Sequence, residues 1–544
     1  MTPPADLVPI GEPCEGEWEE TWDEGWDDEL ADDRMVINVG WEPQRIITLS
    51  LAALVSVFDA SVLFRYGGRL VELVGDRVVP LARPRLERYL AHAVAFVKVD
   101  NNGRATPTWP NTRVLAAVQA SPEGFTCLDR VTRLPFVRPD GTVCTEPGYD
   151  RSTRCLLVLD PELQGIKVPH KPTREQQQQA VQLLTGQWLG DMPLQEQADV
   201  TNLLALVLTP FIRHLVPLVP LAVVDGLAPG VGKNLLADCL SRLVTGVDCD
   251  PLPYSRDEAE MRRLITARIS AGESLFVFDE AHVIAGANLA RTITAPIYTD
   301  RLLGSSRTVQ CPNLVTWVAL GNQVQVLGDM ARRVYRISLR PTQADPDRRG
   351  GFDKPDLRGW TQKHRRALVE AALTLIRAWY ADGQPPAPVT ETFGSFEQWQ
   401  QLLGSILAHA GLRDFLGNTA GWRTNIDFTT TYWQEHLQAV SRQFPAGTRF
   451  TVAQVVQGLR DNSIPECPPE LHDCSKREYP RLLGQAYFRV KERWFGPVRL
   501  VCDGQPGKGG AHRSVAAWKV EIQPAAPGAS EGPEGPTTHP GDFR

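Results

Sequence analysis

Residues 219–233 read VPLAVVDGLAPGVGK, a valine-rich apolar run that ends in a turn of glycine and proline. We expect a strand, a loop and a helix that opens at Lys233 and runs from Asn234 to Leu243. In such loops, glycines let backbone N–H groups approach phosphate oxygens, the helix N-terminus adds positive charge, and a lysine reaches the outer phosphates. Taken alone, the stretch could also be an ordinary glycine-rich turn. The predicted nucleotide-binding residues are Pro229, Gly230, Val231, Gly232, Lys233 and Asn234.

A second apolar strand ends in two acids. Residues 274–279 read SLFVFD, and Glu280 follows them. In ATPases with a phosphate-binding loop, an aspartate at this place coordinates Mg²⁺ and a glutamate polarises the attacking water. Asp279 lies 46 residues after Lys233, which leaves room for a helix, a strand and another helix. We therefore expect Mg²⁺ at Asp279 and Asn234, and a catalytic role for Glu280.

Two further segments follow in order. Residues 314–322 read LVTWVALGN, and the amide of Asn322 could orient the water and sense the γ-phosphate. Arg332 and Arg333 stand just before an apolar strand at 334–339, a place that suits an arginine finger acting on a neighbour's nucleotide. A Gly-Asn turn and a solvated helix end are the simpler interpretations of these two segments. Four weak signals in this order together predict an ATPase core.

The order of these elements resembles the core of AAA+ ATPases. Within that class it is similar to the superfamily 3 helicase-like ATPases of phages, plasmids and integrative mobile elements, of the phage primase-helicase type. The resemblance covers roughly residues 215–339. It implies phosphate binding by Lys233, Mg²⁺ binding by Asp279, water activation by Glu280, a sensor role for Asn322, and a finger in trans from Arg332 or Arg333.

The chain departs from the family pattern at two positions. Leu227 replaces the first glycine of the loop and makes its start less flexible. Asn234 replaces the Ser or Thr whose hydroxyl holds Mg²⁺, and it offers an amide oxygen instead. A nucleotide-binding protein with slow or absent ATP hydrolysis is therefore an open alternative.

Composition places the chain among soluble globular proteins. The 544 residues are 42% apolar and 22% charged, which suggests three or four domains. The chain has no apolar run of about 18 residues, and it does not begin with a basic region and an apolar core, so we expect neither a membrane span nor a secretory signal. The ten cysteines follow no framework spacing, which favours reduced thiols in the cytoplasm.

Charge is concentrated at the N-terminus. Residues 1–33 hold 13 acids and no Lys or Arg, so the rest of the chain is mildly basic. Trp18, Trp22 and Trp26 recur in this segment at four-residue spacing. A solvating tail is the simplest interpretation. A tail that docks on a partner through its tryptophans, and a DNA-mimicking autoinhibitor over a basic surface, are the alternatives.

These observations predict a multidomain α/β protein with a central P-loop AAA+ core. Apolar periodicity predicts helices at 172–214, 361–380 and 396–412. Before the core, Gly67–Gly68 predicts a hairpin and Pro139–Gly141 predicts a turn. The expected order is a disordered acidic tail (1–33), a mixed α+β domain (34–170), a helical collar (171–214), the ATPase core (215–345), a helical lid (346–425), a winged helix (426–522) and a disordered tail (523–544).

Basic residues in two regions are candidates for DNA contact. Arg301 and Arg307 precede the strand that ends at Asn322, where a hairpin of superfamily 3 relatives grips the DNA backbone. An acid at a subunit interface is the other possible partner for Arg301. A third helix at 481–495 and a glycine-rich wing at 503–513 suit DNA phosphates, although a winged helix can also bind protein. The candidates there are Arg489, Lys491, Arg493, Lys508 and Arg513.

We expect an ATP-dependent DNA helicase or translocase that acts in replication of a phage or mobile element. We expect ATP and Mg²⁺ as its cofactors and DNA as its substrate. We also expect the chain to assemble as a ring, in the form of a hexamer, and a separate primase or replication proteins could act with it. A nucleotide-switched DNA-binding initiator or regulator is one alternative, and a protein-remodelling or defence ATPase is another. A zinc site at Cys467, His472 and Cys474, with Cys502 or His512, is a remote possibility because the spacing is unusually long.

Overall fold

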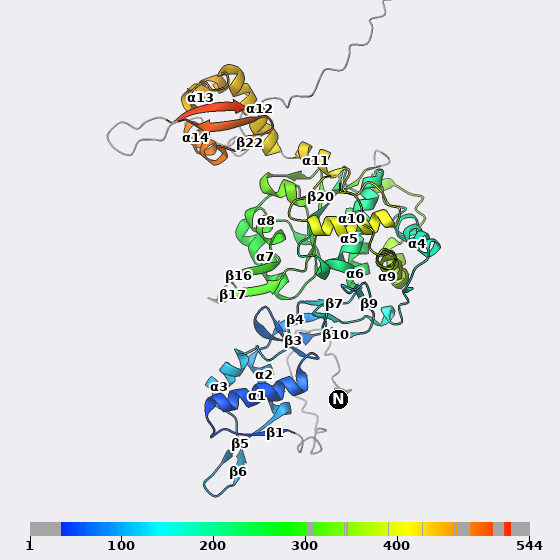
Figure 1. The fold of residues 1–544 in the computed structure, drawn as a ribbon, viewed down its shortest axis with the longest axis vertical. Coiled ribbons are helices and arrows are strands. Elements are labelled where there is room, and N and C mark those ends of the chain that lie inside the picture. Colours follow the sequence, from blue (N-terminus) through cyan, green and yellow to red (C-terminus); the bar gives the residue numbers. More distant parts are fainter. Residues whose placement is uncertain are drawn as a thin grey trace, which may run out of the picture. The chain divides into compact units, whose positions relative to one another are not determined.

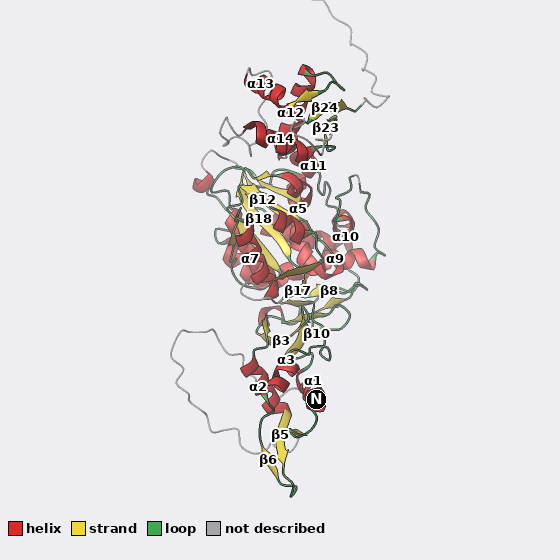
Figure 2. Ribbon diagram, turned by 90° about the vertical axis from the view of Figure 1, so that its left-hand side faces the viewer, coloured by secondary structure: helices red, strands yellow, loops and turns green. Residues whose placement is uncertain are grey.

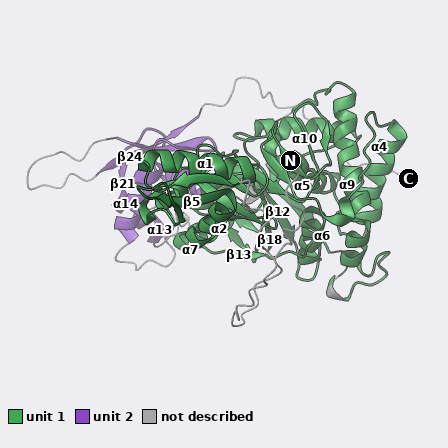
Figure 3. Ribbon diagram, turned by 90° about the horizontal axis from the view of Figure 1, so that it is seen from below, with its two compact units in different colours: residues 1–423 green, residues 424–544 purple. Residues whose placement is uncertain are grey.

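The computed structural model describes residues 34–301, 308–341, 343, 346–389, 391–426, 428–460, 464, 479–503 and 516–523. The two expected tails, apart from residue 523, lie outside this range. The chain forms two compact units, residues 1–423 and 424–544, which Figure 3 colours separately. Both units combine helices with sheets, so the expected mixed α/β, multidomain class is confirmed. None of the described helices has the length and apolar character needed to cross a membrane.

The first part of unit 1 packs three helices on one side of a small sheet (Figure 1). Ile37, Phe96 and Leu54 belong to the core between helices and sheet. The parallel pair β1–β5 is extended by β6, which runs antiparallel to β5. The elements are β1 (Met35–Asn38), α1 (Pro43–Phe58), α2 (Arg83–Ala93), β5 (Val94–Val99), β6 (Ala105–Pro107) and α3 (Thr112–Gln119).

Short strands lie between these helices and the central sheet; they pair antiparallel except for β7 and β11, which are parallel. The hairpin expected at Gly67–Gly68 is confirmed, because β2 and β3 pair on either side of it. The turn expected at 139–141 is also confirmed, since the Arg138 N–H donates to the Thr142 carbonyl. The elements are β2 (Leu63–Tyr66), β3 (Arg69–Val74), β4 (Arg77–Pro80), β7 (Arg130–Thr132), β8 (Phe136–Val137), β9 (Val143–Cys144), β10 (Gly148–Asp150), β11 (Cys155–Leu157) and η1 (Pro161–Leu163).

The expected helices of 172–214 are present. Thr173 caps the first of them in a capping box with Gln176. The last long helix is buried along nearly its whole length because it packs on β18 and β20 of the central sheet and on α10. The elements are α4 (Arg174–Val181), the π-helix η2 (Gln182–Trp188), α5 (Gln197–Ile212) and η3 (Arg213–Leu215).

The centre of unit 1 is a five-stranded parallel sheet in the order β13-β14-β18-β12-β20. All four strands expected at 219–226, 274–279, 314–322 and 334–339 are found, and Figure 2 shows β12 and β18 between α7 and α9. The strands are β12 (Leu221–Gly226), β13 (Leu252–Pro253), β14 (Leu275–Asp279), β18 (Thr316–Asn322) and β20 (Val334–Leu339). The elements between them are α6 (Lys233–Thr245), α7 (Glu258–Ser270), β15 (Val283–Ile284), α8 (Ala287–Ile293), β16 (Ile297–Arg301), β17 (Thr308–Pro312), β19 (Gln325–Val326) and η4 (Gly328–Arg333).

One buried arginine aligns the amino-terminal ends of β12 and β18. The Arg213 guanidinium donates to the carbonyls of Val216, before β12, and of Asn313 and Val315, before β18, at 2.8, 2.5 and 2.9 Å. Burial lowers the pKa of Arg213 to about 9. Three backbone acceptors are thus satisfied at once, and the two strands start in a fixed relation to each other.

Side chains close the β20 edge of the sheet. Asn202 of α5 donates to the Arg336 carbonyl, Arg423 donates to the Val334 carbonyl, and the Ser338 N–H donates to Asp199. An open row of peptide groups would otherwise invite pairing with another chain. The helices that complete unit 1 are η5 (Pro346–Arg348), α9 (Leu357–Ala381), α10 (Glu397–His409) and α11 (Thr419–Ile426), of which the last reaches into unit 2.

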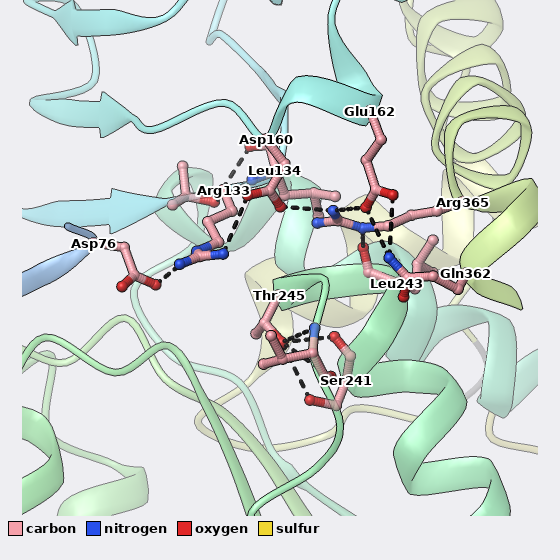
Figure 4. Close-up of polar contacts among 12 residues, drawn as sticks. Asp76, Arg133, Leu134, Asp160, Glu162, Ser241, Leu243, Thr245, Gln362 and Arg365 are labelled. Carbon is pink, nitrogen blue, oxygen red and sulfur yellow. Dashed lines mark hydrogen bonds and ion pairs between the residues drawn. The ribbon is translucent and has the colours of Figure 1, made fainter. Parts of the chain in front are cut away.

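A polar network joins the carboxyl-terminal end of α6 to the short strands of unit 1 (Figure 4). The buried Arg365 of α9 donates to the Leu243 carbonyl of α6, to Asp160 and to Glu162. Asp160 also accepts from Arg133, which donates in turn to Asp76 in the β3–β4 turn. The helix that begins at Lys233 is therefore held at its other end by charge-assisted bonds that reach the β3–β4 turn.

Unit 2 has its own core, built around Trp433, Leu483, Tyr487 and Trp518. Its sheet has the order β21-β24-β23-β22, with every pair antiparallel. The elements are α12 (Phe428–Gln443), β21 (Phe450–Thr451), α13 (Val452–Arg460), α14 (Tyr479–Val490), β22 (Trp494–Phe495), β23 (Val498–Cys502) and β24 (Ala517–Ile522).

The helix expected at 481–495 is corrected by the structure. Helix α14 ends at Val490, and Glu492 adopts a left-handed backbone with φ of +64°. Trp494 and Phe495 instead form β22, which turns through Gly496 into β23. Two aromatic residues before a Gly-Pro turn favour a hairpin, and this local preference overrides the helical periodicity.

Candidate nucleotide site

The carboxyl ends of β12, β14 and β18 lie side by side in the central sheet. The register pairs Gly226 at the end of β12 with Asn322 at the end of β18. The connection from β12 runs toward β13 at one edge of the sheet, whereas the connection from β18 runs toward β20 at the other. Neighbouring strands whose connections diverge in this way leave a crevice at their carboxyl ends, where open α/β sheets bind ligands.

The loop 227–232 spans this crevice and leads into α6. Gly230 and Gly232 have φ values of +79° and +95°, which glycine adopts without steric cost. The buried Val231 anchors the loop, while Pro229 and Gly230 are exposed. Helix α6 has no side-chain cap at its N-terminus. The first N–H groups of the helix therefore have no partner within it and make that end electropositive.

Lys233 and Asn322 meet above the strand ends. The Lys233 Nζ donates to the Asn322 Oδ1 over 2.5 Å. Burial lowers the pKa of Lys233, and the nearby carboxylates of Asp279 and Asp225 act in the opposite direction. The lysine is thus a partly desolvated cation held at the crevice by a neutral acceptor, a contact that an anion could replace.

The Asp279 carboxylate lies beside the first turn of α6. The Asn234 Nδ2 donates to the Asp279 Oδ2 over 3.0 Å, and the Glu280 N–H donates to the Asp279 Oδ1 over 2.7 Å. Mg²⁺ commonly binds one or two carboxylates together with phosphate oxygens and waters. One carboxylate and one amide oxygen next to an anion-binding helix terminus fit that donor set, so Asp279 and Asn234 could hold the ion of a Mg²⁺–nucleotide complex.

The residue after β14 and the residue after β18 each have an unusual backbone conformation. Glu280 follows β14 with φ of +55°, and Gln323 follows β18 with φ of +48°. Left-handed conformations are uncommon for residues with a Cβ atom and gather at functional sites. The turn at Glu280 leaves its side chain exposed at the crevice edge.

Sequence reasoning missed two residues that shape this site, Gly226 and Asp225. A Cβ atom at Gly226 would lie 2.8 Å from the Asn322 Oδ1, 2.9 Å from the Val231 Cγ2 and 3.0 Å from the Lys233 Nζ, so a larger residue there would displace these side chains. The buried Asp225 accepts from the Val324 N–H and from Arg336, and so fixes the turn after Asn322. The family pattern has a glycine at position 227, and in this chain the glycine stands one residue earlier, at 226. The Asp-Gly pair at the end of a buried strand is the sequence feature that could have identified both residues.

The two candidate finger residues differ in their surroundings. The Arg333 side chain is 8% exposed and donates to the carboxylate and the carbonyl of Asp329. The Arg332 side chain is 59% exposed and pairs with the same carboxylate. The hydrogen bond from Arg332, which has the larger effect, and the one from Arg333 lower the pKa of the Asp329 carboxyl group. Arg333 therefore stabilises the η4 turn, and Arg332 is the one that can reach outward.

The candidate DNA-binding residues lie in two places. Arg301 is exposed at the end of β16, and its neighbour Asp300 binds Arg262 and Arg291. Arg489 is exposed on α14, and Lys491 and Arg493 are exposed in the turn that follows it. The remaining candidates, Arg307, Lys508 and Arg513, lie outside the described residues, as do the possible zinc ligands Cys467, His472, Cys474 and His512.

No protein-family model and no curated protein matches the chain. Among solved structures it is similar to the apo A form of the NrS-1 C-terminal region, with 10% identity, a TM-score of 0.36 and coverage of 88% of this chain and 99% of that one. It is also similar to the SCCmec type IV Cch active helicase, with 10% identity, a TM-score of 0.28 and coverage of 86% and 98%. A third match is the JCV helicase, with 14% identity, a TM-score of 0.21 and coverage of 47% and 65%. All three resemblances are remote.

We predict that Gly226→Ala destabilises unit 1 by about 1–3 kcal/mol, since the added methyl group overpacks the contact between Lys233 and Asn322. Urea unfolding of the full chain measures the loss. Gly394→Ala is the matched control, because a Cβ atom there meets nothing within 4 Å; it should stay within about 0.5 kcal/mol of the parent. Equal effects of the two substitutions would contradict the close approach at Gly226.

Proposed function

We propose that the chain is an ATPase that binds Mg²⁺–ATP at the loop 227–232 and uses hydrolysis to act on DNA. The observation that carries the proposal is the convergence of Lys233, Asp279 and Asn322 from three neighbouring elements at one crevice. A cation, a carboxylate and an amide at the end of a parallel sheet suit a polyphosphate and its metal ion.

Phosphate binding follows from the loop and the helix N-terminus. The N–H groups of the loop after Leu227 and of the first turn of α6 would donate to the β-phosphate oxygens, and the Lys233 Nζ would move from Asn322 to the β- and γ-phosphates. The phosphate charge would restore the ordinary pKa that burial lowers in Lys233. Asn322 would then be free to bind the attacking water or the γ-phosphate.

Hydrolysis requires a base and a charge-stabilising group near the γ-phosphate. Glu280 stands after Asp279 and would accept a hydrogen bond from the attacking water. It would then take a proton from that water as the water oxygen attacks the γ-phosphorus and ADP leaves. Mg²⁺, when bound, would neutralise charge on the phosphate oxygens. Arg332, exposed on η4, would supply the further cation to the nucleotide of a neighbouring copy in a ring, for which a hexamer is the form we expect.

DNA is the proposed substrate of the motor, in replication of a phage or mobile element. Exposed Arg301 on the β16 strand and the exposed cations at the end of α14 are the described candidates for phosphate contact. In this proposal unit 2 works as a winged helix that recruits DNA, and α9 and α10 form a lid beside the nucleotide. The remote similarity to helicases is consistent with that assignment.

A second candidate function is a nucleotide-switched DNA-binding initiator with weak hydrolysis. The hydrogen bond from Asn234 to Asp279 favours it, because this amide occupies the carboxylate that would otherwise serve the metal ion. Such a protein would bind ATP tightly and change its DNA affinity with little turnover.

The test is ATP hydrolysis by the full chain with and without single-stranded and forked DNA. We expect DNA to stimulate hydrolysis, and Lys233→Ala and Glu280→Gln to abolish it. Lys171→Ala, an exposed lysine outside the crevice, is the control and should keep the parental rate. Tight ATP binding with negligible turnover under every condition would exclude the motor and support the switch.

We predict that Asn234→Thr raises the hydrolysis rate several-fold and lowers the Mg²⁺ concentration needed for half the maximal rate. The substitution releases Asp279 from the amide and supplies a hydroxyl as a metal ligand. A magnesium titration of steady-state hydrolysis measures both changes. Asn234→Ala frees the carboxylate without adding a ligand and should show no gain; a slower threonine variant would contradict the assignment.

We also predict that Arg332→Ala lowers hydrolysis by about 10³-fold without unfolding the protein, as expected for an exposed finger. Mixing it with Lys233→Ala should restore part of the activity, because an intact loop on one copy then meets an intact arginine on its neighbour. Mixing Lys233→Ala with Glu280→Gln is the control, and it should stay inactive since both groups act within one copy. If the mixture of Arg332→Ala with Lys233→Ala recovers no more activity than this control, a role for Arg332 in trans is excluded.

A further inference from the structure

Helix α14 of unit 2 has one side in the core and the opposite side in solvent. Leu483, Ala486 and Tyr487 are buried and belong to the core of this unit. Positions three, four or seven residues apart share one side of a helix, and four exposed residues of α14 follow this spacing on the side away from the core. This exposed stripe consists of Arg481, Gln485, Phe488 and Arg489.

Phe488 is the apolar member of the stripe and is 41% exposed. Its ring stands edge-on against the ring of the buried Trp518, with the two centroids 4.8 Å apart. The Lys491 Nζ lies 5.6 Å from the centroid of the Phe488 ring. Among the described residues the nearest acid in the chain is Glu492, which lies beyond the end of the helix. The stripe thus presents an accessible apolar group beside cations, a combination that suits a polyanion with apolar groups of its own.

Gln485 and Phe488 have the side chains that distinguish A·T base pairs in the major groove of DNA. A glutamine amide can bond the N6 and N7 atoms of adenine, and a phenylalanine ring can contact the methyl group of thymine. The two residues are three positions apart on the helix, which puts their Cβ atoms about 5–6 Å apart, whereas stacked base pairs are about 3.4 Å apart. The two side chains can therefore reach the same base pair or neighbouring ones.

We propose that unit 2 binds duplex DNA with the exposed stripe of α14 in the major groove, where Gln485 reads adenine and Phe488 contacts the methyl group of thymine. The exposed Arg481 and Lys491 would contact the phosphates beside these base pairs. The inference rests on the proposed role of unit 2 in recruiting DNA, and it adds a preference for A·T pairs to that role. A single strand is a poorer occupant, because the stripe has one aromatic ring, whereas single-strand grooves stack successive bases on several.

Binding of three short duplexes to the full chain, without nucleotide, tests the proposal. The duplexes have equal length and the same mixed order of purines and pyrimidines, and they are built from A·T, A·U or I·C pairs. The A·U duplex lacks only the thymine methyl group. The I·C duplex presents the major-groove pattern of G·C but lacks the guanine amino group, so its minor groove resembles that of A·T. Fluorescence anisotropy should show the A·T duplex bound at least about threefold more tightly than A·U, and A·U at least about fivefold more tightly than I·C.

Two variants separate the two base contacts. Phe488→Ala should bind the A·T and A·U duplexes equally and keep an affinity for A·U close to the parental one, which also shows that the helix is folded. Gln485→Ala should bind the A·U and I·C duplexes equally and still prefer A·T over A·U. The matched controls are Phe352→Ala, since Phe352 is 40% exposed and also lies beside a cation, Arg349, and Gln178→Ala on α4. Both controls should keep the parental ratios of affinity.

Arg481→Ala and Lys491→Ala should weaken binding of the three duplexes alike, and each should reduce the slope of log affinity against log salt by about one, as expected for phosphate contacts. Equal affinity for the three duplexes, or an A·T preference that survives both Gln485→Ala and Phe488→Ala, would overturn the proposal. Tighter binding of the matching single strands would assign the stripe to unpaired bases and would overturn it too. DNA bound without these preferences refutes this inference alone, whereas no binding of any DNA would also refute the recruitment of DNA by unit 2.

Discussion

The close approach of Gly226, Lys233 and Asn322 is the contact on which the candidate site depends. Parallel pairing places Gly226 beside Asn322, and the absence of a side chain at 226 lets the lysine cross to the amide. Asp225, one residue earlier, holds the turn after Asn322 and bonds to Arg336 of β20. Three strands of the sheet are therefore fixed to one another at the point where a ligand would bind, and little reorganisation is needed to bind it.

Both ends of this arrangement are anchored. Arg213 aligns the amino-terminal ends of β12 and β18 through three carbonyls. At the far end of α6, Gly246 has φ of +80°, and a Cβ atom there would lie 2.8 Å from the Arg365 guanidinium. Arg365 connects this helix to the carboxylates of Asp160 and Glu162. A shift of the amino-terminal end of α6 would thus be transmitted to α9 and, through Arg133, to the β3–β4 turn (Figure 4).

The sequence predicts the central sheet well because its strands are buried apolar runs with clear ends. The strands ending at Asp279, Asn322 and Leu339 were each placed within two residues at their amino-terminal ends. The end of the helix expected at 481–495 was misplaced. The apolar periodicity of this stretch masks the turn at Glu492 and the hairpin that begins with Trp494 and Phe495. Local turn chemistry decides such boundaries, and a pattern of apolar spacing does not contain it.

The sequence predicts which residues form the candidate site, but it does not predict the contacts between them. Motif order brings Lys233, Asp279, Glu280 and Asn322 to one edge of a sheet, but the distances depend on register, which only the fold supplies. For the same reason sequence alone did not separate the buried Arg333 from the exposed Arg332.

Equilibrium titration of the full chain with ATP and with AMP, in the presence of Mg²⁺, tests the central claim most directly. The account predicts one ATP per chain, AMP bound at least about tenfold more weakly because it lacks the outer phosphates, and a loss of ATP affinity of the same order in Lys233→Ala. ATP bound equally well by the Lys233→Ala protein, or AMP bound as tightly as ATP, would show that the crevice at the loop 227–232 does not bind a triphosphate.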